Sequence, residues 1–261
     1  MTTPIKPGTL YLFPTPLGKT KENVCIPEHV LKKLHTVTCF CVENLQNAVS
    51  VLKWAEHPVP DFKLQFYELN KRTAETTLNE YVQEILSGKD MGILTDAGCP
   101  AIADPGANLV KLAHHFDIDV VPFTGPSSPL LALMGSGLGG QKFAFNGYLP
   151  VKAQARENAI KELEQRSAEN GSSELFMETP FRNMETLKSL LNTLENDTLL
   201  TITANLTLEA EYIKTREVSD WKHRKMPDID KQPAIFGIKA KENKPPVELL
   251  RRKAVRKKFS R

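Results

Sequence analysis

Short apolar runs alternate with amphipathic helical patterns through the first half of the chain. Helical spacing of apolar residues predicts helices over 27–34, 78–86 and 109–116, and Gly88 stands where the second of them should end. Between these patterns lie runs of apolar and β-branched residues, the composition of buried strands, at 9–13, 36–42, 91–95 and 119–123. Strands that alternate with helices of this length need crossover connections, so the pattern predicts βαβ units and a parallel sheet.

The second half of the chain alternates less regularly and contains more strand. Helical patterns cover 153–167 and the segment after Pro180, a residue that suits the first turn of a helix. Strand patterns lie at 143–149, 175–177, 199–203, 210–214 and 234–238. A glycine-rich stretch over 135–142 predicts a linker between the halves. We therefore expect an N-terminal α/β domain over 1–138, a mixed α+β domain over 139–242 and a basic tail over 243–261.

Composition limits the class of protein. The chain has 261 residues, of which 41% are hydrophobic and 25% charged, so it can bury a core, and its net charge of +3 permits a polyanionic partner without requiring one. No pair of cysteines has the Cys-x-x-Cys spacing of a zinc or redox site, and we expect free, mostly buried thiols in a reducing compartment. No signal peptide and no run of ~18 apolar residues is present, so we expect a soluble cytoplasmic protein that does not enter a membrane.

Loops rich in glycine and proline follow three of the predicted strands, at 14–18, 96–106 and 124–128. Ligands of open α/β sheets bind beyond the carboxyl ends of the strands, where glycine lets the backbone approach closely. Short hydroxyl side chains such as Ser127 and Ser128 can form hydrogen bonds there and still leave room. Such turns are common in α/β proteins, but three in this order and spacing indicate one ligand site.

These loops carry a resemblance that covers residues 8–239. The chain resembles the tetrapyrrole (corrin/porphyrin) methylase superfamily and, within it, is similar to the ribosomal RNA small subunit methyltransferase I family, which methylates a cytidine 2′-hydroxyl in 16S rRNA. The matching segments are GTLYLFPTPLG at 8–18, LTDAGCPAIADPG at 94–106, VPFTGPSS at 121–128, FNGYLPVK at 145–152 and FMETPFR at 176–182. The resemblance implies two α/β lobes, S-adenosylmethionine as methyl donor in the cleft between them, and a homodimer.

Matching by position also implies which residues contact the donor. Ser127 and Ser128 would bind its methionine end or its ribose. The other implied contacts are Pro16 and Leu17 in the first loop, Cys99, Ala101 and Ile102 in the second, and Met177, Leu206 and Ala234 around the adenine. Cys99 stands where many tetrapyrrole methylases have aspartate and where the rRNA branch has threonine.

The chain departs from the rRNA branch near the expected site of chemistry. That branch has Gly-Asn after the first loop and Glu-Asp-Thr-Arg after the second strand, whereas this chain has Gly18-Lys19 and Glu43-Asn-Leu-Gln46. A ribose hydroxyl is a poor nucleophile that benefits from a positioned base or acceptor. We therefore expect Glu43 nearest the chemistry, with Asn70 and Arg182 as positioning groups.

No metal is expected, because methyl transfer from a sulfonium mainly requires that the two reacting atoms be held in line. Asp96 and Asp104 suggest a metal pair or catalytic acids, but acidic residues beside glycine and proline more often brace turns. None of the histidines forms a metal spacing with a carboxylate or cysteine.

Three functions remain open at this stage. The first is methylation of 16S rRNA, with free RNA or the small ribosomal subunit as substrate. The basic tail and the stretch from Lys152 to Arg156 would then be candidate RNA contacts. The second is methylation of a small molecule such as a tetrapyrrole. The third, motivated by the change at Asn44-Leu-Gln46, is donor binding without catalysis.

Overall fold

The computed structural model describes residues 6–19 and 25–241, and it divides into two compact units. The first unit comprises the chain up to Ser128 together with Thr207–Glu209, and the second comprises Pro129–Leu206 and the chain from Ala210. The boundary between the two units therefore lies after Ser128, ten residues before the one predicted at 138. The reason is that helix α5 (Ser128–Ser136) belongs with the second unit, where the Ser136 carbonyl accepts a hydrogen bond of 2.6 Å from Thr215. The predicted basic tail lies outside the described residues.

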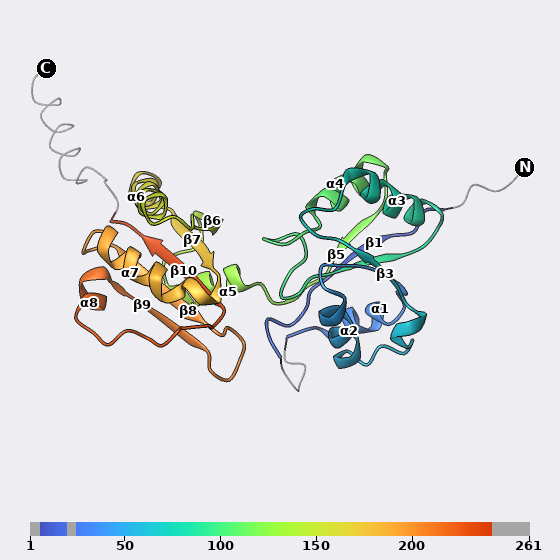
Figure 1. The fold of residues 1–261 in the computed structure, drawn as a ribbon, viewed down its shortest axis with the longest axis horizontal. Helices are drawn as coiled ribbons and strands as arrows, with labels where there is room; N and C mark the ends of the chain where they lie inside the picture. Colours follow the sequence, from blue (N-terminus) through green and yellow to red (C-terminus); the bar gives the residue numbers. More distant parts are fainter. Residues whose placement is uncertain (1–5, 20–24, 242–261) are drawn as a thin grey trace, which may run out of the picture. The chain divides into compact units, whose positions relative to one another are not determined.

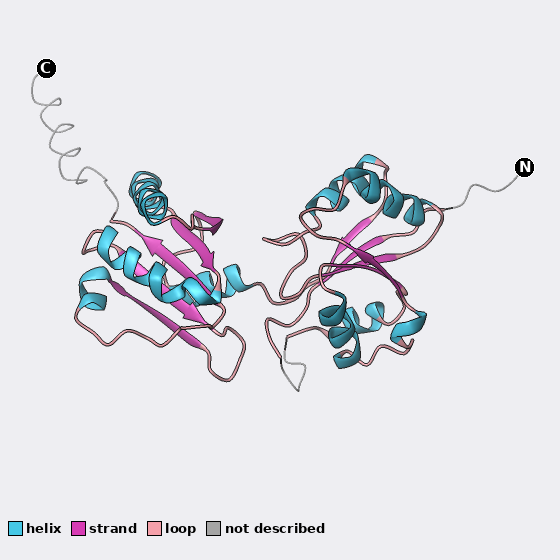
Figure 2. Cartoon of the chain, viewed as in Figure 1, coloured by secondary structure: helices cyan, strands magenta, loops and turns pink. Residues whose placement is uncertain are grey.

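A five-stranded, wholly parallel sheet forms the centre of the first unit (Figures 1 and 2). Its strand order is β3-β2-β4-β1-β5. The strands are β1 (Leu10–Phe13), β2 (Cys39–Val42), β3 (Gln65–Glu68), β4 (Met91–Leu94) and β5 (Val120–Pro122). The helices are α1 (Glu28–Leu34), α2 (Leu45–Trp54), η1 (Asp61–Lys63), α3 (Glu75–Leu86) and α4 (Ala107–His115).

Successive side chains along the central strands point to opposite faces of the sheet, and each face packs into its own apolar core. Leu12 and Cys41 point into the core made with α3 and α4. Phe13 and Phe40 point into the opposite core, made with α1 and α2. Figure 1 shows these helix pairs on opposite sides of the sheet. The loops at the carboxyl ends of the strands are consequently held by a sheet that is buried on both faces.

The second unit contains a mixed sheet of order β6-β7-β10-β8-β9. Strands β6 and β7 are parallel and the other pairs are antiparallel. The elements are β6 (Phe143–Tyr148), α6 (Ala153–Asn170), β7 (Ser173–Glu178), η2 (Pro180–Arg182), α7 (Asn183–Thr193), β8 (Leu199–Ala204), β9 (Tyr212–Glu217), α8 (Val218–Lys222) and β10 (Ala234–Lys239). Parallel strands in the first sheet and mixed strands in the second confirm the predicted fold class.

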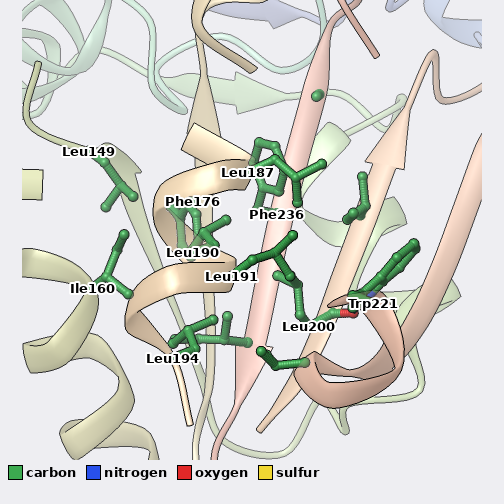
Figure 3. Close-up of a cluster of buried hydrophobic side chains, with 14 of the residues drawn as sticks. Leu149, Ile160, Phe176, Leu187, Leu190, Leu191, Leu194, Leu200, Trp221 and Phe236 are labelled. Atoms are coloured by element: carbon green, nitrogen blue, oxygen red, sulfur yellow. The ribbon is translucent and has the colours of Figure 1, made fainter. Parts of the chain in front are cut away.

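The core of the second unit lies between its sheet and the helices α6, α7 and α8. Figure 3 shows Leu187, Leu190 and Leu191 of α7 beside Phe176 and Phe236 of the sheet, with Trp221 of α8 at the side. The indole of Trp221 donates a hydrogen bond of 2.9 Å to the Leu200 carbonyl, which satisfies its one polar atom inside the core.

The sequence patterns missed the short helices η1 and α8 and three further elements of this fold. Helix α2 was not predicted, although its N-cap Asn44 accepts a hydrogen bond of 3.1 Å from the backbone of Asn47. Strand β3 is a sheet edge with exposed ends, so it lacks the apolar run of a central strand. Helix α5 was not predicted because it is apolar on nearly all sides, so its sequence shows no one-sided apolar pattern, and because it runs into the glycine-rich stretch.

Candidate functional site

Three loops meet at the carboxyl edge of the parallel sheet. The loops after β1 and β4 are joined by a pair of backbone hydrogen bonds between Thr15 and Gly98, of 2.9 and 3.1 Å. The loop after β5 packs against the first loop so closely that a Cβ on Gly125 would lie 2.2 Å from the Pro14 ring. The Cys99 thiol donates to the Pro126 carbonyl at 3.4 Å, which links the second loop to the third. The loops therefore form one continuous surface.

The loop after β4 holds an unusual backbone conformation. Ala101 and Ala103 both have a φ of 64°, in the left-handed region that costs an alanine roughly 1–2 kcal/mol. Gly98 and Gly106 have φ values of 87° and 133°, where glycine avoids this cost. Between the two strained alanines, the Ile102 side chain is 51% exposed. Strain that presents an apolar side chain to solvent is typical of a ligand-binding loop.

Thr95 and Asp104 brace this loop. The Thr95 hydroxyl donates a hydrogen bond of 2.5 Å to Asp104 and accepts one of 3.2 Å from the Ala97 backbone. Asp104 thus has the bracing role that its place beside proline and glycine suggested.

The predicted donor contacts of the first unit lie along this edge. Leu17 contacts Gly98, because a Cβ there would be 3.2 Å from the leucine methyl. Cys99 and Ala101 are half-buried, and burial raises the pKa of the Cys99 thiol, so this group remains neutral at pH 7. The remaining contacts are Pro16 in the first loop, Ile102 in the second, and Ser127 and Ser128 at the start of α5.

The predicted donor contacts of the second unit share one end of its sheet. Met177 lies opposite Ile235 in the pairing of β7 and β10, next to Ala234. Ala234 pairs with Ala204 of β8, and Leu206 follows that strand, buried at 6% exposure. That these three surround an adenine stays a prediction.

Glu43 lies in an acidic cluster at the end of β2. Its pKa is raised, first by burial and then by the negative charges of Asp104 and Asp96, while the positive charge of Lys71 opposes the shift. The pKa of Asp104 is also raised, mainly by burial, although its hydrogen bond from Thr95 opposes that shift. A carboxylate with a raised pKa takes up a proton more readily than an ordinary glutamate does.

Asn70 and Arg182 both act within their own turns. The Asn70 side chain accepts from the Arg72 backbone at 2.7 Å and donates to Glu68, so it holds the turn after β3. Arg182 forms an ion pair with the buried Glu178 and donates from Nε to Thr179 at 3.1 Å.

The expectation that the stretch from Lys152 to Arg156 contacts RNA is wrong for Arg156. Arg156 was a candidate RNA contact, but it is 1% exposed, and its guanidinium bonds Glu185 at 2.6 Å, Ser189 at 3.1 Å and the Val151 carbonyl at 3.1 Å. Arg156 therefore joins α6 to α7 and is not available to RNA. Lys152 is exposed.

A pocket of about 520 Å³ opens beside the three loops, and its main wall is the unpredicted helix α2. It is lined by Pro16, Gly18, Lys19, Gln46, Asn47, Ser50, Val51, Trp54 and Asp96. An N-cap at Asn44, followed by Ala48 and Leu52 at helical spacing, was the sequence signal that could have located it.

Residues 6–19 and 25–241 contain neither a metal-ligand cluster nor a membrane-spanning helix. No cluster of three or more histidine, cysteine, aspartate or glutamate side chains in that part could hold a metal ion. No helix there combines the length and apolar character needed to cross a bilayer.

Comparison with solved structures identifies the fold. The crystal structure of the methyltransferase CobJ matches with a TM-score of 0.55 at 16% identity, over 89% of this chain and 94% of that one. The protein therefore has the tetrapyrrole-methylase fold, as the resemblance implied.

Comparison with curated proteins finds relatives named "Ribosomal RNA small subunit methyltransferase I". The relative from Vibrio cholerae serotype O1 is 31% identical over 205 residues, which are 78% of this chain and 67% of the relative. The relative from Buchnera aphidicola subsp. Schizaphis graminum is 29% identical over 80% of this chain and 69% of its own length. A Streptococcus pyogenes serotype M3 relative is 34% identical over 70% of this chain and 60% of its own. No protein-family model matches the chain. The chain belongs to the ribosomal RNA small subunit methyltransferase I family.

Proposed function

We propose that this protein transfers a methyl group from S-adenosylmethionine to the 2′-hydroxyl of a nucleotide in 16S rRNA. The observation that carries the proposal is the surface made by the three interlocked loops, in a chain of this family. The names of the relatives supply the class of substrate, which is RNA of the small ribosomal subunit.

The residues of the loop surface fit the donor chemically. Ile102 and Leu17 offer apolar surface to its adenosine and thioether carbons. Ser127 and Ser128 offer hydroxyls, which can donate to a carboxylate or accept from a ribose. Gly98 and Gly125 lie where the loops touch one another, and they bring backbone amides and carbonyls close to the same surface. In the second unit, Met177, Leu206 and Ala234 are proposed as apolar contacts of the adenine.

When bound, the donor supplies an activated methyl group, and the protein must orient the acceptor hydroxyl and accept its proton. Glu43 is proposed as the proton acceptor, because its raised pKa and its place among Asp96 and Asp104 favour proton uptake. Asn70 and Arg182 are proposed as positioning residues, Asn70 through the turn after β3 and Arg182 through the buried Glu178 at the end of β7.

Two further proposals concern assembly, which rests on the family resemblance, and location, which rests on the proposed substrate. The protein acts as a homodimer, and it works in the cytoplasm, where small-subunit rRNA is found. Sedimentation of the purified chain at micromolar concentration tests the first proposal, since a monomer mass would refute it.

Calorimetric titration with S-adenosylmethionine tests the donor site. The wild type should bind the donor, and Ile102→Asp should weaken binding by at least tenfold, because it places a carboxylate on the proposed apolar contact. Phe62→Asp is the matched control, since Phe62 is 80% exposed on η1, outside the three loops. Equal affinity of both variants would contradict the assignment of the loop surface.

A further inference from the structure

The pocket on α2 shares Pro16 with the predicted donor contacts, but its other lining residues are not among them. Gln46, Ser50 and Trp54 are spaced four residues apart and so lie along one face of α2, with Asn47 and Val51 beside them. Pro16, Gly18 and Lys19 of the first loop also line the pocket, as does Asp96 of the second.

Trp54 gives the pocket a fixed aromatic surface. Its indole is half-buried because one part packs against the apolar core beneath α2, while another part lines the pocket. A ring held in this way loses little further freedom when a flat ligand stacks on it. Aromatic stacking of this kind is the common way in which proteins hold an unpaired nucleobase.

The polar groups around Trp54 suit a nucleotide. The side-chain amides of Gln46 and Asn47 each carry a donor and an acceptor, the combination needed to pair with the edge of a base. Ser50 donates to the Gln46 carbonyl at 2.8 Å and keeps its lone pairs as acceptors. Lys19 is exposed at the rim and brings a positive charge suited to a phosphate.

The size and position of the pocket further limit the class of ligand that it can hold. About 520 Å³ lies within the range of roughly 300–1,000 Å³ typical of sites for one small ligand, so the pocket holds a single nucleotide rather than a helix. Helix α2, which supplies most of its lining, follows the N-cap Asn44, and Asn44 is the residue after Glu43. A base seated here therefore keeps its ribose near the proposed proton acceptor and the three loops.

We infer that this pocket receives one unpaired nucleotide of the RNA substrate, its base stacked on Trp54, its edge read by Gln46 and Asn47, and a flanking phosphate near Lys19. The inference rests on the proposed function, since it names the substrate subsite of that reaction. The target nucleotide, or its neighbour, must then leave its stack before the methyl group is transferred.

Tryptophan fluorescence tests the inference in the full-length protein. The chain has two tryptophans, and Trp221 is 2% exposed in the second unit, so quenching by a stacked base reports on Trp54. A single-stranded RNA pentanucleotide should quench the emission, and the same strand within a duplex should not. Trp54→Ala should weaken pentanucleotide binding, measured by anisotropy, by roughly 5- to 150-fold, the range of one base–aromatic stack. Trp54→Phe should retain most of the affinity, and Phe62→Ala should match the wild type.

Parallel titration with S-adenosylhomocysteine separates the possible failures. Normal binding of this donor product with no effect of Trp54→Ala on RNA would overturn the subsite and leave the proposed function standing. Quenching of Trp54 by S-adenosylhomocysteine alone would assign the pocket to the donor and would also overturn the inference. Absence of donor-product binding in the wild type would refute the proposed function itself.

Discussion

Replacing Gly125 by alanine tests the interlocking of the three loops. The added Cβ would lie 2.2 Å and 2.3 Å from two ring carbons of Pro14, whereas carbon atoms in contact prefer about 3.5–4.0 Å. The first and third loops must therefore separate by more than ~1 Å. Forcing an extra methyl group into a well-packed site costs about 1–3 kcal/mol. A displacement of this size at a reacting centre lowers activity by roughly 10²-fold.

Gly140→Ala is the matched control, because a Cβ there would lie 3.6 Å from Leu133, an ordinary contact. Urea unfolding gives the free energy of unfolding of both variants, and calorimetry gives their affinities for S-adenosylmethionine. Gly125→Ala should lose about 1–3 kcal/mol of stability and at least tenfold in donor affinity. Gly140→Ala should change stability by less than about 1 kcal/mol and leave donor binding intact. If Gly125→Ala matches the wild type in both measurements, the three loops do not form a rigid donor surface.

Three further perturbations test separate parts of the molecule. Glu43→Gln should lower the rate of methyl transfer by roughly 10²–10⁴-fold with donor affinity unchanged. Because the pKa of Glu43 is raised, wild-type activity should fall on acidification at a pH above the usual 4.5 of glutamate, and the variant should lack this limb of the pH profile. Arg156→Met should cost about 1–3 kcal/mol in urea unfolding, because it removes the hydrogen bonds that join α6 to α7, yet it should not change the salt dependence of RNA binding. Burial raises the pKa of Cys39 to about 11 and that of Cys41 well above its usual 9.0, so iodoacetamide at pH 8 should modify both only after urea unfolding, and rapid labelling of the folded protein would contradict their burial.

Strong periodicity allowed most of the fold to be predicted from the sequence. The apolar residues of α3 recur at helical spacing and those of β4 form one continuous run, so the bounds of both elements differ little from the prediction. Gly88 has a φ of 97°, the left-handed conformation that ends such a helix. Edge strand β3 could not be found this way, because a strand with exposed ends shows little apolar alternation.

The candidate site was predictable only in part, because side-chain partners depend on tertiary contacts. The order of the glycine–proline loops located the sheet edge, yet only the fold shows that Gly125 touches Pro14. Arg156 looked like a surface cation in the sequence, but a charge in a helix can be buried when several partners surround it. The pocket on α2 was missed with its helix, and Trp54 with it.

Transfer of a labelled methyl group to ribosomal RNA tests the central claim most directly. The purified protein would be incubated with S-adenosylmethionine labelled in its methyl group and with small ribosomal subunits from a strain that lacks this protein, and 16S rRNA would then be isolated. The account predicts label at one nucleotide, which nuclease mapping would place on a ribose that resists alkaline cleavage at that position. Donor binding without label in any RNA, or label on a base, would contradict it.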